Sequence, residues 1–172
     1  MREVLDLREV RFAPEDDGVL QAVAVKFNVL DTYGTSFDSR AFQTGSVRLP
    51  MLWSHQADQV IGSWSNLAVE GDELRATGKL NLEVGRAREI RAMLSAGDIS
   101  GVSIGFETLK AEARKSVRHI TKVRLHEISL VALPSVPGSR VTAIRSGGNG
   151  ATADFIAAVK SASRAFSQET TP

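Results

Sequence analysis

Apolar and polar residues alternate along much of the first two-thirds of the chain, a pattern typical of strands with one buried face. The alternation is clearest over residues 19–29, where most odd positions are apolar, and it returns over residues 74–80. Apolar runs at residues 51–55 and 59–64 predict two further short strands. Residues 69–74 have the composition of a hairpin turn. This part of the chain is therefore predicted to be rich in short strands.

Helical spacing of apolar residues occurs in the second half of the chain. Within residues 84–96 one apolar stripe is formed by Ala87, Ile90, Met93 and Leu94. Gly97 follows that stripe and is suited to cap the helix. Asp38 predicts the cap of one short helical turn over residues 38–42. Many short strands with few helices predict a mainly β fold with flanking helices (α+β), arranged as a closed or nearly closed β-barrel.

The end of the chain differs in composition from the rest. Residues 146–150 are Ser-Gly-Gly-Asn-Gly, the composition of a flexible linker. Apolar residues recur at helical spacing over residues 151–167. We therefore expect a β-barrel domain over residues 1–145, followed by a linker and an amphipathic C-terminal helix or tail over residues 146–172.

Composition excludes several classes of protein. The chain has 172 residues, 42% of them hydrophobic and 24% charged, which suits one globular domain. The formal net charge of +1 gives no bias toward nucleic acid or membrane surfaces. The absence of cysteine excludes disulfides, a thiolate nucleophile and cysteine-ligated metals. The N-terminal residues lack the apolar stretch of a signal peptide, so a soluble protein is expected.

Residues 101–106, Gly-Val-Ser-Ile-Gly-Phe, place a serine between two glycines in a run with strand alternation. The three apolar residues share one face and are predicted to be core. Ser103 shares the other face with Gly101 and Gly105, so its hydroxyl has no side chain on either side. Glycine within a strand often marks the close approach of another backbone. The segment therefore fits either a nucleophile that attacks a peptide carbonyl or a plain sheet surface of small residues.

The sequence contains three histidines, at positions 55, 119 and 126. His55 ends an apolar run and is either a catalytic base or a structural or surface residue. His119 lies in a basic stretch and is predicted to be solvated. His126 alternates with Ile128 and Leu130, and so is expected on their face. The histidines are scattered without the spacing of metal ligands, so no metal site is expected.

Glu127 lies in an apolar segment, residues 125–133, that is predicted to be well buried. A carboxylate removed from water costs several kcal/mol unless it is paired or hydrogen-bonded. A histidine N–H is one candidate partner. A strand-edge position that reaches solvent, or a pair with an arginine, is the alternative.

A serine hydroxyl becomes a strong nucleophile when a base removes its proton and a third group orients that base. Ser103, His55 and Glu127 are the side chains suited to the roles of nucleophile, general base and orienting acid. Triads are defined by geometry and not by order along the chain, so the order His, Ser, Glu is no objection.

Five stretches stand in a specific order over about residues 20–145. They are Phe27-Asn28 with Asp38–Phe42 behind it, LPMLWSH ending at His55, VIGSW just after it, GDISGVSIGF around Ser103, and LHEISLVALPSVPGSRV around Glu127. In this order and spacing the chain resembles the prohead (capsid maturation) proteases of HK97-type tailed phages. The three residues after His55, Gln-Ala-Asp, depart from the Asp and Pro of many family members, which we interpret as a loop variation.

The resemblance implies a serine endopeptidase with the fold of the herpesvirus assembly proteases, a β-barrel surrounded by helices. The family's catalytic serine matches Ser103, its histidine matches His55 and its acidic residue matches Glu127. Herpesvirus enzymes use a second histidine in the third role, so His126 is kept as the alternative to Glu127.

The resemblance also implies the partners. The expected substrates are the scaffolding region of the major capsid protein and the protease itself, cleaved inside the prohead in the host bacterial cytoplasm. Self-association of the protease is a further contact that the resemblance suggests. No cofactor, nucleic acid or membrane partner is expected. The particle is that of a phage, a prophage or a gene transfer particle. The competing function is a non-catalytic scaffold or capsid-associated β-barrel module, which predicts that Ser103 and His55 tolerate replacement by alanine without loss of processing.

Overall fold

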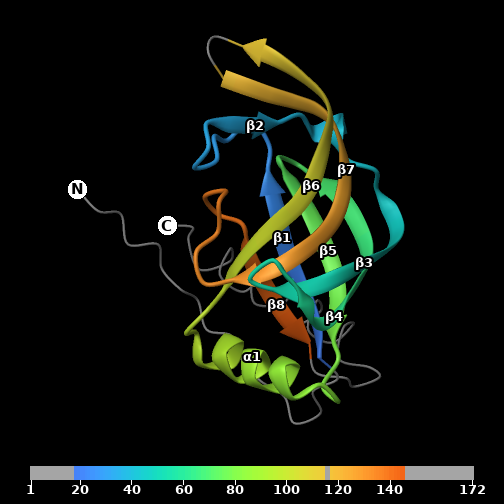
Figure 1. Cartoon of the computed structure of the whole chain (residues 1–172), viewed down its shortest axis with the longest axis vertical. Coiled ribbons are helices and arrows are strands. Elements are labelled where there is room, and N and C mark those ends of the chain that lie inside the picture. Colours follow the sequence, from blue (N-terminus) through green and yellow to red (C-terminus); the bar gives the residue numbers. More distant parts are fainter. Residues whose placement is uncertain (1–17, 115–116, 146–172) are drawn as a thin grey trace, which may run out of the picture.

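The computed structural model describes residues 18–114 and 117–145, which are mainly strands (Figure 1). In chain order the elements are β1 (Val19–Lys26), β2 (Thr35–Phe37), the 3₁₀ helix η1 (Ser39–Ala41), β3 (Gly45–Trp53), β4 (Gln56–Glu70), β5 (Glu73–Leu80), α1 (Gly85–Ala96), β6 (Gly101–Arg114), β7 (Val117–Val131) and β8 (Arg140–Arg145). The linker and helix predicted over residues 146–172 lie outside the described residues.

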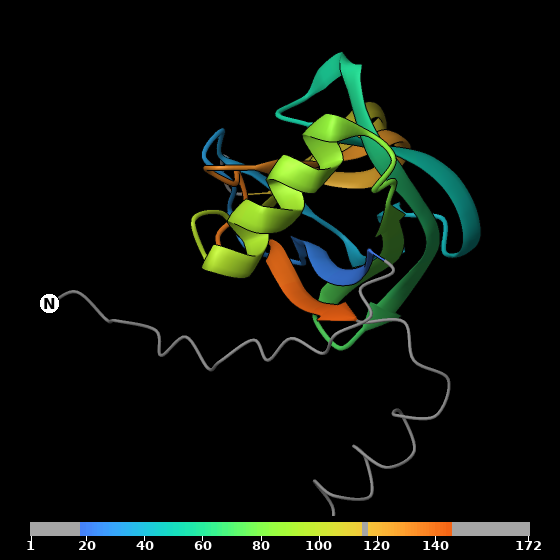
Figure 2. The same ribbon diagram turned by 90° about the horizontal axis from the view of Figure 1, so that it is seen from below.

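The strands are joined into a ring of hydrogen-bonded neighbours. Their order is β2-β7-β3-β4-β5-β1-β8-β6, and β6 pairs again with β7. The contact between β6 and β8 is the single residue pair Gly101–Arg140. Helix α1 packs across one end of the ring and buries Ala87, Ile90 and Leu94 (Figure 2). The predicted mainly β fold with flanking helices is thus confirmed. Closure of the barrel stays a prediction, because β6 and β8 are joined at a single residue pair.

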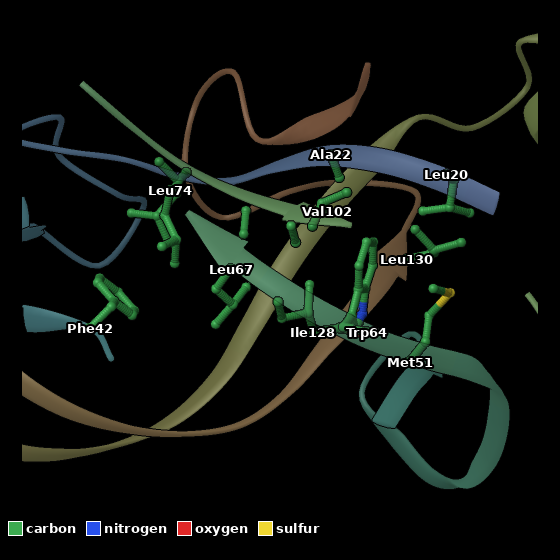
Figure 3. Packing of buried hydrophobic residues seen from close by; sticks show 14 of the residues in the cluster. Leu20, Ala22, Phe42, Met51, Trp64, Leu67, Leu74, Val102, Ile128 and Leu130 are labelled. Atoms are coloured by element: carbon green, nitrogen blue, oxygen red, sulfur yellow. The ribbon is translucent and has the colours of Figure 1, made fainter. Parts of the chain in front are cut away.

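The hydrophobic core fills the inside of the strand ring (Figure 3). Trp64 of β4 is fully buried, and its indole Nε1–H donates to the Ile128 carbonyl of β7 at 2.9 Å. Trp64 lies against Gly78 of β5, where an added Cβ would come within 2.7 Å of the indole ring. Ile128 and Leu130 of β7 are fully buried beside it. These core contacts therefore determine which face of β7 points into the strand ring.

The predicted strand at residues 19–29 differs from the observed β1. The register of β1 against β5 shifts between Val23 and Val25, so residues on both sides of the shift enter the core. Leu20 and Ala22, at even positions, are buried in that core, which the odd-position pattern did not predict. The strand ends at Lys26 instead of residue 29. Asn28 follows soon after, and its left-handed φ of 58° turns the chain away from the direction of β1.

The predicted helical elements are confirmed where the structure describes them. Helix α1 ends at Gly97, whose left-handed φ of 81° is readily adopted by glycine. Asp38 caps η1 and accepts from the backbone N–H of Arg40. Within the two described ranges, no helix has the length and apolar character to cross a membrane.

Candidate active site

Three adjacent strands, β3, β7 and β6, carry the predicted site residues (Figure 1). On β6, Ser103 pairs with Ser129 of β7, and Gly105 pairs with Glu127. On the other side of β7, β3 runs parallel and places Leu52 beside Ser129. Paired strands lie about 5 Å apart, so side chains at these positions meet on one face of the sheet. The register thus brings the end of β3 and the beginning of β6 to the same stretch of β7.

Strand β3 ends in a tight turn that contains His55. Trp53 pairs with Gln56, so Ser54 and His55 form a two-residue loop between β3 and β4. Both loop residues have positive φ, 50° and 60°. Such a loop matches the twist of a hairpin but strains residues that are not glycine or asparagine. Ser54 N donates to Leu130 O at 2.9 Å, which holds this strained turn against β7.

The His55 ring is bound to Glu127. The Nδ1 atom of His55 lies 2.7 Å from Oε1 of Glu127. Glu127 is buried, with 8% of its surface exposed, whereas the His55 side chain is 44% exposed. The second oxygen of Glu127 accepts from the hydroxyl of Ser129 at 2.7 Å. The buried carboxylate therefore has partners on both oxygens, and it engages the Nδ1 atom of the His55 ring and not Nε2.

The two glycines that flank Ser103 make room for other parts of this chain. A Cβ on Gly105 would overlap the carboxylate of Glu127, and a Cβ on Gly101 would lie 2.6 Å from the carbonyl of Val131. Pro134 covers Gly101 from the same side, at 2.9 Å from the added Cβ. Glu127 and the segment after β7 therefore occupy the space beside both glycines, which is not open to a substrate.

Ser103 is 6% exposed and contacts the segment after β7. Its Oγ lies 3.4 Å from Oγ of Ser135, and in the described part of the chain no hydrogen bond joins it to His55. A cavity of about 160 Å³ opens beside it and is lined by apolar residues that include Phe37 and Phe106 and by polar ones that include Asp31 and Arg118. The structure thus brings His55 and Glu127 into direct contact and places Ser103 one strand away.

His126 lies away from this cluster. The register of β6 and β7 shifts between Gly105 and Phe106, which pair with Glu127 and Leu125 and leave His126 as the extra residue of a bulge. His126 is exposed, and its nearest acidic atom is Oε2 of Glu107 at 4.0 Å. The expectation that alternation puts it on the face of the buried core residues is therefore wrong.

His119 was expected to be solvated, and this expectation is also wrong. It is 2% exposed, and its Nδ1 lies 2.9 Å from Oγ of Ser36, its parallel partner on β2. Its Nε2 lies 3.6 Å from Oδ2 of Asp38, too far for a hydrogen bond. Hydrogen bonds from the side chain and the backbone N–H of Arg40 lower the pKa of Asp38 to about 2. These contacts fasten β2 and η1 to β7.

A hydroxyl, an imidazole and a carboxylate on adjacent strands are the side chains that serine hydrolases use. The family model described as Caudovirus prohead serine protease matches residues 4–152, and the chain belongs to this family. The prohead protease of Enterobacteria phage HK97 is 24% identical over 152 residues, covering 82% of this chain and 67% of that protein. The resemblance inferred from the sequence is thus confirmed.

Solved structures of Kaposi's sarcoma-associated herpesvirus protease share the fold. The structure in complex with a dimer disruptor matches with a TM-score of 0.50 and 13% identity, over 80% of this chain and 81% of that chain. A complex with a hexapeptide phosphonate inhibitor matches with a TM-score of 0.48 and 13% identity, over 73% of this chain and 64% of that chain. This chain therefore spans less than two-thirds of the second structure, and the likeness concerns the fold alone.

Two features of the site were not predicted from the sequence. Ser-His is not one of the dipeptides, such as Asn-Gly or Asp-Gly, that signal a two-residue hairpin loop, so the turn at residues 54 and 55 was not predicted. The second feature is the role of Ser129. Its small polar side chain within Ile-Ser-Leu-Val was the available hint, because a buried hydroxyl needs a hydrogen-bond partner.

The lowered pKa of Asp38 predicts an acid-dependent loss of stability. Its pKa is about 2 in the folded chain against an ordinary 3.8, so the carboxylate stabilises the fold above pH 3.8 and this contribution is lost as the pH falls through about 2. Asp38→Asn should therefore lower the free energy of unfolding at pH 7, and the difference from wild type should shrink between about pH 4 and pH 2. Urea unfolding across this range measures the effect. Arg40→Gln is the matched control, and a carboxyl titration by NMR should show the pKa of Asp38 returning toward its ordinary value.

Gly105→Ala should break the bond between His55 and Glu127, because the new Cβ takes the place of the carboxylate. We expect the downfield NMR signal of the His55 Nδ1 proton to be lost while the far-ultraviolet circular dichroism is retained. Gly85→Ala is the control, since its Cβ would meet no atom nearer than 3.8 Å. Retention of the His55 signal in Gly105→Ala would show that the carboxylate does not need this space.

Proposed function

We propose that this chain is a serine endopeptidase of phage capsid maturation, with Ser103 as nucleophile, His55 as general base and Glu127 as orienting acid. The observation that carries the proposal is the contact of 2.7 Å between His55 Nδ1 and the buried Glu127 carboxylate. A carboxylate on Nδ1 fixes the tautomer of the ring, leaves Nε2 as the base and stabilises the imidazolium that forms. Membership of a prohead serine protease family supports the same assignment.

The reaction proceeds by acyl transfer. The Oγ of Ser103 attacks the carbonyl carbon of the scissile peptide bond as its proton passes to Nε2 of His55. The tetrahedral intermediate collapses, the C–N bond breaks, and the leaving amine takes the proton from His55. Water then attacks the acyl ester with His55 again as base, which releases the new carboxyl end and restores the Ser103 hydroxyl.

The edge of β6 next to Ser103 is suited to an extended substrate. Val102 N donates to Ser139 O at 3.1 Å, and the strand pairings described for β6 beyond that point all lead to β7. A peptide that adds along an unpaired edge gains backbone hydrogen bonds and places alternate side chains in pockets. The cavity of about 160 Å³ beside Ser103, with Phe37 and Phe106 but also Asp31 and Arg118 in its lining, is suited to one substrate side chain.

We propose that the substrates are the scaffolding region of the major capsid protein and the protease itself, cut inside the prohead in the host cytoplasm. The relative from phage HK97 bears the name prohead protease, which supports this assignment. The division into a protease domain over residues 1–145 and a linker and tail over residues 146–172 remains part of the proposal.

Ser103→Ala should abolish trimming of the cognate major capsid protein in co-expression, because the mutant has no nucleophile to form the acyl-enzyme. Mass spectrometry of both proteins measures the result. Ser100→Ala, an exposed serine just before β6, is the matched control and should trim like wild type. If Ser103→Ala trims equally well, the nucleophile is elsewhere. If shells form and wild type does not trim, the non-catalytic capsid-associated module becomes the better account.

Glu127→Gln and His126→Gln should separate the two candidates for the third role. Glu127 contacts His55 and His126 does not, so the first change should slow processing about a hundredfold or more and the second should leave it near wild type. The rate of capsid protein cleavage by the purified variants is the measurement. The reverse result would assign the third role to His126.

A further inference from the structure

The hydroxyl of Ser129 is linked to both the backbone and the ring of His55, to the backbone directly and to the ring through Glu127. It lies 3.1 Å from the backbone N of His55 and 2.7 Å from Oε2 of Glu127. The other carboxylate oxygen of Glu127 contacts the His55 ring. The main chain and the ring of His55 therefore both bind to one Ser129–Glu127 unit.

We propose that Ser129 is a positioning residue for the reaction: it fixes the general base by holding the His55 backbone and the Glu127 carboxylate together. This inference rests on the proposed function. Ser129 has 0% of its surface exposed, so it acts through His55 and Glu127 and does not touch the substrate.

The directions of these hydrogen bonds follow from chemistry. A backbone N–H can only donate, so Ser129 Oγ accepts from His55. The single hydroxyl proton of Ser129 is then free to be donated to Oε2 of Glu127. Oε1 of Glu127 remains to accept from Nδ1–H of His55. The three bonds close a ring that begins and ends at His55, which restricts both the strained turn and the rotation of the imidazole.

The same bonds distinguish the two serines that face each other across β6 and β7. Ser103 and Ser129 are direct partners in the sheet and share a face. Ser129 uses both its proton and a lone pair, whereas Ser103 makes one long contact of 3.4 Å with Ser135. The hydroxyl with weaker ties is the one free to react. The structure thus gives a reason, independent of the flanking glycines, to assign Ser103 as nucleophile and Ser129 as support.

The strained turn explains why the backbone contact matters. Residues other than glycine that are held at positive φ are strained, and they persist in that conformation only where surrounding contacts hold them. The bond from His55 N to Ser129 is one such contact, and the bond from Ser54 N to Leu130 is another. Loss of the first allows the turn to relax and moves the imidazole. A displacement of about 1 Å can slow a reaction about a hundredfold.

Two isosteric variants test this role. Ser129→Thr keeps the hydroxyl and Ser129→Val replaces it with a methyl group, while both add the same bulk to a buried site. The rate constant for labelling of Ser103 by a fluorophosphonate probe, followed by mass spectrometry, needs no knowledge of the cleavage site. We expect Ser129→Val to react about a hundredfold more slowly than wild type and Ser129→Thr to stay within about tenfold. Equal rates for the two variants would overturn the proposal.

A second readout does not depend on activity. The downfield NMR signal of the His55 Nδ1 proton should be present in wild type and Ser129→Thr and be lost or shifted in Ser129→Val. If the added methyl group prevents folding of both, Ser129→Ala replaces them, with the same expectation as Ser129→Val. An unchanged signal in a folded variant without the hydroxyl would refute the positioning role. If wild type itself resists labelling, the proposed function fails, and the NMR comparison still decides the role of Ser129.

Discussion

The structure depends on one constraint, the burial of a carboxylate in the last third of strand β7. Removing Glu127 from water costs several kcal/mol unless its oxygens find partners, and both oxygens do. One partner, His55, must then come from the end of β3, so β3 has to run beside β7. The space that the carboxylate occupies must be free on β6, so Gly105 has to lack a side chain. Both β3 and β6 therefore have features that accommodate the side chain of Glu127.

The two faces of β7 carry different kinds of side chains, apolar core residues on one face and polar residues of the candidate site on the other. Ile128 and Leu130 point into the core, where Trp64 also hydrogen-bonds the Ile128 carbonyl. Glu127 and Ser129 alternate with them on the opposite face. A slip of one residue would exchange the two sets and bury the wrong side chains, so the hydrophobic core holds the register on which the polar cluster depends.

Two kinds of feature could be predicted from the sequence: elements with a repeating hydrophobic pattern, and side chains that are chemically unusual for their surroundings. Alternation, the stripe of α1 and the glycine cap at Gly97 were sufficient for the mainly β fold, and a carboxylate in an apolar segment pointed to Glu127. Short or irregular elements were missed, because β2 has three residues and the bulge at His126 interrupts the period that places it. His119 was wrongly expected to be solvated, since its partner Ser36 lies 83 residues away. A contact between residues so far apart in the chain produces no pattern in the sequence around either of them.

The parallel pairing of β3 with β7 has a consequence for how the molecule is made. His55 and Glu127 are separated by 72 residues, so a long loop must close before their contact can form. Non-local contacts of this kind form late in folding, after hairpins such as β4–β5. A chain still on the ribosome holds the histidine but lacks its acidic partner until β7 has emerged. The order of synthesis alone therefore prevents His55 and Glu127 from meeting until β7 has left the ribosome.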